Sequence, residues 1–127
     1  MLNDRPTLSD PLLSVVMPVF NESHTVERII GRVLSVPLRL ELIVIDDGST
    51  DKTVSIIETF NDKRIHIIKH KKNLGSLNAR IRALEASKGE YIAILDADDI
   101  AMPSRLKIQS EFLKKNTDYG LVGGIAE

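Results

Sequence analysis

Short apolar segments alternate with amphipathic segments along this chain, and the alternation predicts strands that alternate with helices. The apolar segments are rich in β-branched side chains, which is typical of strands buried on both faces of a parallel sheet. They span residues 12–19, 40–45, 65–68 and 91–95. Pro18 is expected to lie at the end of the first strand, because proline cannot donate a hydrogen bond inside a sheet.

Between the strands, apolar side chains recur at helical spacing, so each intervening segment is expected to bury one face. The four helices are expected at about residues 23–35, 51–60, 76–87 and 103–116. Asn21 or Ser23 is expected to cap the first helix and Ser76 the third, because their side chains can accept a hydrogen bond from a free backbone N–H. Pro103 suits the first position of the fourth helix.

The last two helices carry more detailed expectations. Leu77, Ile81 and Leu84 share one side of the third helix and are expected to face the core. Gly89 is expected to end that helix in the left-handed conformation. Residues 119–127 are expected to begin a fifth strand. The inner face of the fourth helix is expected to consist of Leu106, Phe112 and Leu113.

This order of elements predicts an α/β fold. Its expected form is a three-layer sandwich with a mostly parallel central sheet, helices on both faces and right-handed crossovers. Residues 12–127 are expected to form this unit, and the polar residues 1–11 a flexible leader. Ligands of such folds bind beyond the carboxyl ends of the strands.

The composition excludes several function classes. The 127 residues include 17 basic and 18 acidic side chains, so no strong field attracts nucleic acid. Cysteine is absent, which excludes disulfides and thiol chemistry. The histidines (His24, His66 and His70) are scattered and are expected at the surface or at strand edges.

The sequence also bears on location. No apolar run approaches the roughly 18 residues that a membrane span requires. Residues 1–11 lack the basic and apolar regions of a secretory signal. We therefore expect a cytoplasmic location, with attachment to the cytoplasmic face of the membrane as an open alternative.

An acidic cluster follows the fourth apolar segment directly. Asp96, Asp98 and Asp99 place three carboxylates within a short turn. Two carboxylates roughly 4–5 Å apart repel by about 3–4 kcal/mol at an effective dielectric constant near 20, so the cluster suits a bound cation. Oxygen ligands of this kind are typical of Mg²⁺ and Mn²⁺ sites. The alternative is a turn whose aspartates cap the next helix.

Two other polar turns are expected at the same edge of the sheet. Asn21 and Glu22 follow the first strand, and Asp46 and Asp47 follow the second. Because parallel strands end at one edge, we expect these turns and the acidic cluster to share one ligand site.

Four motifs, taken together and in order, carry a family resemblance. They are Pro18-Val19-Phe20-Asn21-Glu22, Asp46-Asp47-Gly48-Ser49-Thr50-Asp51, Asn73-x-Gly75 with Ala79-Arg80, and Gly89-Glu90-Tyr91-Ile92 before Asp96-Ala97-Asp98-Asp99. Over residues 12–127 the chain resembles family 2 glycosyltransferases of the GT-A fold. The resemblance implies a nucleotide-diphospho-sugar donor, usually UDP-linked, a divalent cation (Mn²⁺ or Mg²⁺), and transfer of a hexose with inversion, as in polysaccharide biosynthesis.

The resemblance also implies roles for individual acidic residues. Asp98 would bind the metal, and Asp96 would face the ribose or reach the metal through water. Asp99 would either cap the next helix or support the metal. Asp47 would accept a hydrogen bond from a uracil N–H, with Asp46 as the alternative for that role.

The remaining donor-site residues follow from the same resemblance. Glu22 would hold ribose or base, or else is a carboxylate favoured by the start of a helix. Arg80 would approach the diphosphate. The others assigned to nucleotide-sugar binding are Pro18, Val19, Phe20, Gly75 and Ala97.

The second half of the family pattern is missing. That half normally holds the acceptor site and the carboxylate that takes the acceptor proton. We therefore expect a donor-binding part, with no catalytic base of its own and with an unknown acceptor. We also expect self-association through uncovered apolar surface.

Two other functions stay open. One is a non-catalytic module that binds sugar nucleotides. The other is a Mg²⁺-dependent phosphotransferase or phosphatase whose Asp96 attacks phosphorus; it leaves Asp47 and the Asn73-x-Gly75 motif without a role.

Overall fold

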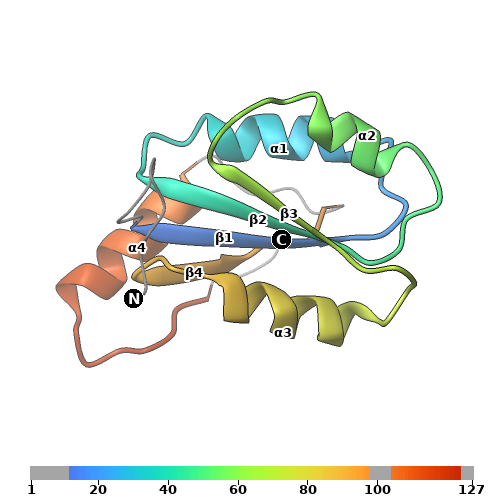
Figure 1. Cartoon of the computed structure of the whole chain (residues 1–127). Helices are drawn as coiled ribbons and strands as arrows, with labels where there is room; N and C mark the ends of the chain where they lie inside the picture. Colours follow the sequence, from blue (N-terminus) through green and yellow to red (C-terminus); the bar gives the residue numbers. More distant parts are fainter. Residues whose placement is uncertain (1–11, 98–103, 124–127) are drawn as a thin grey trace.

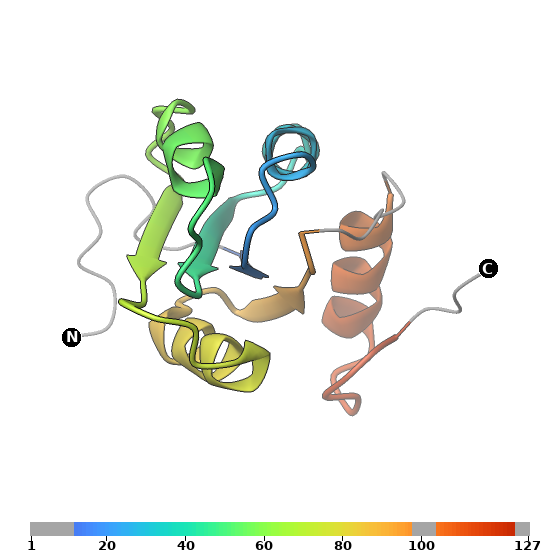
Figure 2. The ribbon, with the colours of Figure 1, turned by 90° about the vertical axis from the view of Figure 1, so that its right-hand side faces the viewer.

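The computed structural model describes residues 12–97 and 104–123 and contains one parallel sheet with helices around it (Figure 1). The elements are β1 (Leu13–Val19), α1 (Val26–Leu34), β2 (Leu40–Asp46), α2 (Thr53–Glu58), β3 (Ile65–Lys69), α3 (Ser76–Ala86), β4 (Tyr91–Ile94) and α4 (Arg105–Lys115). The strand order is β3-β2-β1-β4, and every pair is parallel. Helices α1 and α2 cover one face and α3 the other, which confirms the predicted layered α/β fold (Figure 2).

The core is densest around β1 and β2, the two central strands. All seven residues of β2 are buried. Its five apolar side chains divide between two apolar clusters, one shared with α1 and α4 and the other with α3. Burial on both faces explains why these segments are almost continuously apolar.

A buried polar contact lies between these central strands. Ser14 and Glu41 are register partners, and the Ser14 hydroxyl donates to Glu41 Oε1 at 2.6 Å. Lys88 N–H donates to Glu41 Oε1 at 2.9 Å, and Gly89 N–H donates to Ser14 Oγ at 2.7 Å. Because a buried carboxylate is costly unless it is hydrogen-bonded, this contact fixes the turn between α3 and β4 to the sheet.

The expected left-handed end of α3 at Gly89 is wrong. The positive-φ glycines of the described chain are Gly48 and Gly75. Gly89 is required for a different reason, since a Cβ there would lie 2.5 Å from Ser14 N. The absence of a side chain lets the turn approach β1 closely.

The expected helix caps are also wrong. Helix α1 begins at Val26, and within the described residues it has no side-chain cap from Asn21 or Ser23. Asn21 instead adopts φ 51° in the preceding loop. Ser76 is the first residue of α3 itself, and Gly75 takes the cap position at φ 96°.

Helix α3 buries a different face from the one predicted. Leu77, Ile81 and Leu84 are 70%, 46% and 42% exposed. Ala79 and Ala83 are fully buried against β1 and β2 instead. Small side chains let a helix approach a sheet closely. The alanine face therefore packs against the sheet, although the leucine face is more hydrophobic.

The C-terminal elements differ in part from expectation. In α4, Leu106 is buried, Leu113 is half-buried and Phe112 is exposed, with its ring 5.4 Å from that of Tyr119. Residues 119–123, where the fifth strand was expected to begin, form no strand. The rest of the expected fifth strand, from residue 124, and Pro103 lie outside the described residues.

Replacing Gly89 by alanine should destabilise the fold by about 1–3 kcal/mol, because the added methyl group meets the β1 backbone. Urea denaturation measures the change. Gly31→Ala is the matched control, since nothing lies within 4 Å of its Cβ position. Alanine in helix α1 should raise stability by up to about 1 kcal/mol. Equal stability of the two variants would contradict this account of Gly89.

Candidate functional site

A cavity of about 390 Å³ opens at the carboxyl ends of β1, β2 and β4, the end that Figure 2 shows. It is lined by Pro18, Val19, Phe20, Glu22, Asp47, Asn73, Ser76, Ala79, Arg80, Asp96 and Ala97. Most of the residues predicted for the site therefore meet in one place. Asp46 and Gly75 do not line it, and Asp98 and Asp99 lie outside the described residues.

Asn21 joins the first polar turn to the second. Its backbone N–H donates to Ser49 Oγ at 2.9 Å, and its side-chain Oδ1 accepts from Thr50 N–H at 2.8 Å. Asparagine tolerates the left-handed conformation that this loop requires. Asn21 thus organises the loop that places Phe20 and Glu22 on the cavity wall.

Asp51 holds the start of α2 against this loop. It accepts hydrogen bonds from the hydroxyl and the N–H of Thr53, and from Ser23 N–H at 3.4 Å. The Thr53 hydroxyl has the largest effect and lowers the pKa of Asp51 to about 2 from an ordinary 3.8, while partial desolvation acts in the opposite direction. Asp51 is therefore ionised throughout the physiological range.

Asp47 is the most heavily hydrogen-bonded carboxylate of the cavity. Its Oδ1 accepts from Leu74 N–H and contacts His70 Nδ1 at 2.8 Å, and its Oδ2 accepts from Gly75 N–H at 2.9 Å. Burial is the largest influence and raises the pKa of Asp47, but these hydrogen bonds more than offset it, so the pKa is lowered. The carboxylate is ionised and ties residues 70–75 to the end of β2.

His70 does not line the cavity but contacts it through Asp47, and the sequence did not indicate this contact. It was expected at a surface or strand edge, yet its side chain is only 11% exposed and pairs with Asp47. The register of β2 with β3 explains the pair. Asp46 pairs with Lys69, so the residues that directly follow the two strands, Asp47 and His70, lie side by side.

Asp46 and Gly48 stabilise the turn that follows β2. Asp46 accepts from Ser49 N–H at 3.3 Å and is buried, which is the position of a turn-stabilising carboxylate. At Gly48, with φ 82°, a Cβ would lie 2.6 Å from the Lys72 backbone. Glycine here allows residues 70–75 to pass over the turn.

Arg80 and Asp96 form the charged pair of the opposite wall. Arg80 Nη2 donates to both carboxylate oxygens of Asp96, at 3.0 and 3.2 Å. Their side chains are 40% and 39% exposed, so the pair is open to a ligand. Arg80 Nε is buried and makes no hydrogen bond to the residues that the structure describes.

The metal site predicted at Asp96 and Asp98 can be tested only at Asp96. Its carboxylate faces the cavity and is a suitable oxygen ligand. Within residues 12–97 and 104–123, no group of three histidine, aspartate or glutamate side chains could hold a metal ion. One or two carboxylates are nevertheless common at Mg²⁺ and Mn²⁺ sites completed by phosphate and water, so Asp96 is compatible with such a site.

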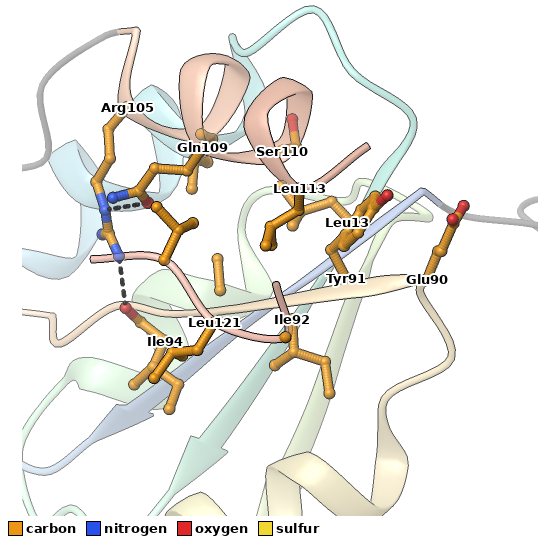
Figure 3. Close-up of a pocket in the computed structure, with 14 residues that line it drawn as sticks. Leu13, Glu90, Tyr91, Ile92, Ile94, Arg105, Gln109, Ser110, Leu113 and Leu121 are labelled. Carbon is orange, nitrogen blue, oxygen red and sulfur yellow. Dashed lines mark hydrogen bonds between the residues drawn. The ribbon is translucent and has the colours of Figure 1, made fainter. Parts of the chain in front are cut away.

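A second, larger cavity of about 460 Å³ lies between β4, α4 and residues 120–122 (Figure 3). Ile92, Ile94 and Leu121 are among the residues that line it, and Arg105 donates to Ile94 O at 3.4 Å. It shares no residue with the first cavity. The candidate site is the smaller cavity, because Glu22, Asp47 and the Arg80–Asp96 pair converge there at the carboxyl ends of the strands.

Comparison with known proteins identifies similar sequences. The family model described as Glycosyl transferase family 2 matches residues 14–127. An uncharacterised glycosyltransferase of Haemophilus influenzae is 39% identical over 120 residues, covering 92% of this chain and 37% of the relative. The Escherichia coli protein WfgD, a UDP-Glc:α-D-GlcNAc-diphosphoundecaprenol β-1,3-glucosyltransferase, is 36% identical over 110 residues, which cover 86% of this chain and 44% of WfgD.

Solved structures show the same fold. The mannosyltransferase PcManGT of Pyrobaculum calidifontis, in complex with GDP-Man and Mn²⁺, has a TM-score of 0.74 and 26% identity over 87% of this chain and 34% of its own. TarS of S. aureus has a TM-score of 0.76 and 25% identity over 83% of this chain and 33% of its own. The chain thus spans less than half the length of these proteins.

Within residues 12–97 and 104–123, no helix is both long enough and apolar enough to cross a bilayer.

Asp51→Asn should make the free energy of unfolding less dependent on pH in the acid range. Because the folded-state pKa of Asp51 is lowered to about 2 from 3.8, its contribution is complete above about pH 4 and is lost as pH falls toward 2. Urea denaturation between pH 2 and 5 should show a shallower loss of stability in the variant. The control is Asp118→Asn, an exposed residue with no side-chain hydrogen bond to the described part of the chain. A variant profile parallel to the wild-type profile would refute the role given to Asp51.

Proposed function

The chain belongs to glycosyltransferase family 2, and on that premise we propose that its acidic cavity binds the nucleoside diphosphate of a UDP-sugar. The observation that carries the proposal is that Asp47 and the Arg80–Asp96 pair line a single cavity of about 390 Å³. That volume falls within the roughly 300–1,000 Å³ typical of small-molecule sites. The parent enzyme would be an inverting glycosyltransferase that transfers a hexose to an acceptor hydroxyl.

The base end of the proposed site is Asp47. An ionised carboxylate offers about four acceptor positions, and three donors already occupy Asp47. One position on Oδ2 remains for a ligand, and a uracil ring N–H supplies one donor. Val19 and Phe20 would form the apolar wall beside the base. Glu22, also on the wall, would bind base or ribose.

The diphosphate end is proposed at Arg80 and Asp96. Arginine suits phosphate because its guanidinium donates several hydrogen bonds in a fixed plane. A divalent cation, Mn²⁺ or Mg²⁺, held by Asp98 and Asp96 would neutralise charge on the departing diphosphate. PcManGT, which contains GDP-Man and Mn²⁺, supports this proposal by its similar fold. Pro18, Gly75 and Ala97 complete the set proposed for nucleotide-sugar binding.

For these 127 residues alone, we propose donor binding without transfer. The carboxylate that takes the acceptor proton and the acceptor site would belong to the further length that the relatives have. Family membership favours this function over an aspartate phosphotransferase. A cytoplasmic location remains an expectation.

Isothermal titration with UDP-glucose, with and without Mn²⁺, tests the proposal. We expect saturable binding that strengthens with Mn²⁺ and weakens about tenfold in Asp47→Asn, because an amide cannot replace a charged acceptor. Asp118→Asn should bind as the wild type does. A turnover assay with a broad acceptor panel should yield no product. Failure to bind any nucleotide-sugar with either metal would refute the donor-site proposal. Robust transfer would refute the proposal that these 127 residues bind the donor without transferring the sugar.

Self-association is a separate proposal, supported by uncovered apolar side chains. Leu77 and Leu84 lie about one helical turn before and after Arg80, on the same side of α3. Arg80 donates to Asp96, which follows β4. This side of α3 therefore faces the edge of the sheet that β4 forms. Ile92 and Ile94 are also exposed there. Apolar surface of this kind favours association in water.

Sedimentation velocity over a range of concentrations checks this proposal. Leu77→Gln/Leu84→Gln should shift the protein toward monomer, whereas Ile108→Gln, on exposed α4 surface, should have little effect. A wild-type protein that stays monomeric at high concentration would exclude self-association.

A further inference from the structure

We propose that His70 is a positioning residue for base selection, which it achieves by occupying one acceptor position of Asp47. The proposal rests on the proposed nucleotide site and extends it to a residue that does not line the cavity. His70 would act only through the Asp47 carboxylate. It would leave a single acceptor position for the nucleobase.

His70 is anchored to the sheet rather than to a loop. Its backbone N–H donates to Asp46 O at 2.8 Å, which continues the hydrogen bonding between β2 and β3 beyond Lys69. Its ring is 11% exposed and the Asp47 side chain 5% exposed. The Nδ1–Oδ1 contact of 2.8 Å is therefore held by rigid backbone on both sides.

The chemistry of the pair defines the state of the ring. Asp47 is ionised and can only accept, so Nδ1 of His70 carries the hydrogen and donates it. The hydrogen bond thus restrains the rotation of both the His70 ring and the Asp47 carboxylate.

Counting donors shows what His70 adds. Oδ1 of Asp47 receives two hydrogens, from His70 and Leu74, and Oδ2 receives one, from Gly75. The free acceptor is therefore on Oδ2. Without His70, the carboxylate would lose one of its three restraints, and the free acceptor on Oδ2 would no longer be held in one direction. A uracil ring N–H donates to that acceptor, whereas the corresponding ring nitrogen of cytosine carries no hydrogen. The preference for uracil over cytosine would therefore fall.

The test compares UDP with CDP, because the two share the ribose and the diphosphate. The contributions of Arg80 and of any metal ion to binding then cancel in the ratio of dissociation constants. Isothermal titration in Mg²⁺ should show that wild type prefers UDP. His70→Leu removes the donor and should reduce the ratio of the CDP dissociation constant to the UDP dissociation constant about tenfold.

Two further variants separate positioning from a purely structural role. His70→Asn places an amide N–H near the position of Nδ1 and should keep the ratio within about twofold of wild type, whereas His70→Gln places it farther out and should behave like His70→Leu. If His70→Leu does not fold, the Asn and Gln pair carries the comparison. His24→Asn, on an exposed turn, is the matched control.

The outcomes are distinguishable. A wild type that binds neither UDP nor CDP would refute the proposed nucleotide site itself. UDP binding with an unchanged ratio in His70→Leu or His70→Gln would overturn only the role of His70, even if stability falls. If His70→Asn reduces the ratio as much as His70→Leu does, the role of His70 is also overturned, because the asparagine retains an N–H donor near the position of Nδ1.

Discussion

The parallel hydrogen bonding of the sheet continues into the residues of the site, and this constraint fixes where the polar turns begin. Asp47 N–H donates to Val19 O at 2.9 Å, and His70 N–H donates to Asp46 O at 2.8 Å. The polar turns therefore start from fixed backbone at a single edge. Side chains that begin on rigid strands are held more precisely than side chains carried on loops.

Two buried carboxyl groups at opposite ends of the sheet both accept hydrogen bonds from backbone N–H groups of segments distant in sequence. Asp47 accepts backbone N–H groups from Leu74 and Gly75, and Glu41 accepts one from Lys88. A carboxyl group is costly to bury without hydrogen-bond partners, and in both cases a segment distant in sequence supplies donors. The cost of burial thereby determines where those segments can lie. At one end the result is a cavity wall, and at the other a tight turn onto β1.

The family relationship and the geometry support each other without being equivalent. Family 2 membership follows from a match over residues 14–127. The geometry adds that Glu22, Asp47, Arg80 and Asp96 meet at one cavity, which no single motif implies. The chain spans 37% of the length of one relative and 44% of the length of another.

The sequence by itself determined the element order, the parallel α/β class and the turns that form the site, because apolar periodicity and strand-end polarity are local properties. It did not determine the buried face of α3, since the close approach of Ala79 and Ala83 to the sheet outweighed the larger Leu77 and Leu84. Nor did it reveal the partner of Asp47. His70 lies 23 positions away in sequence, and only the register of β2 with β3 brings the two side chains together. Contacts across strands depend on tertiary packing, and for that reason the structure alone decided them.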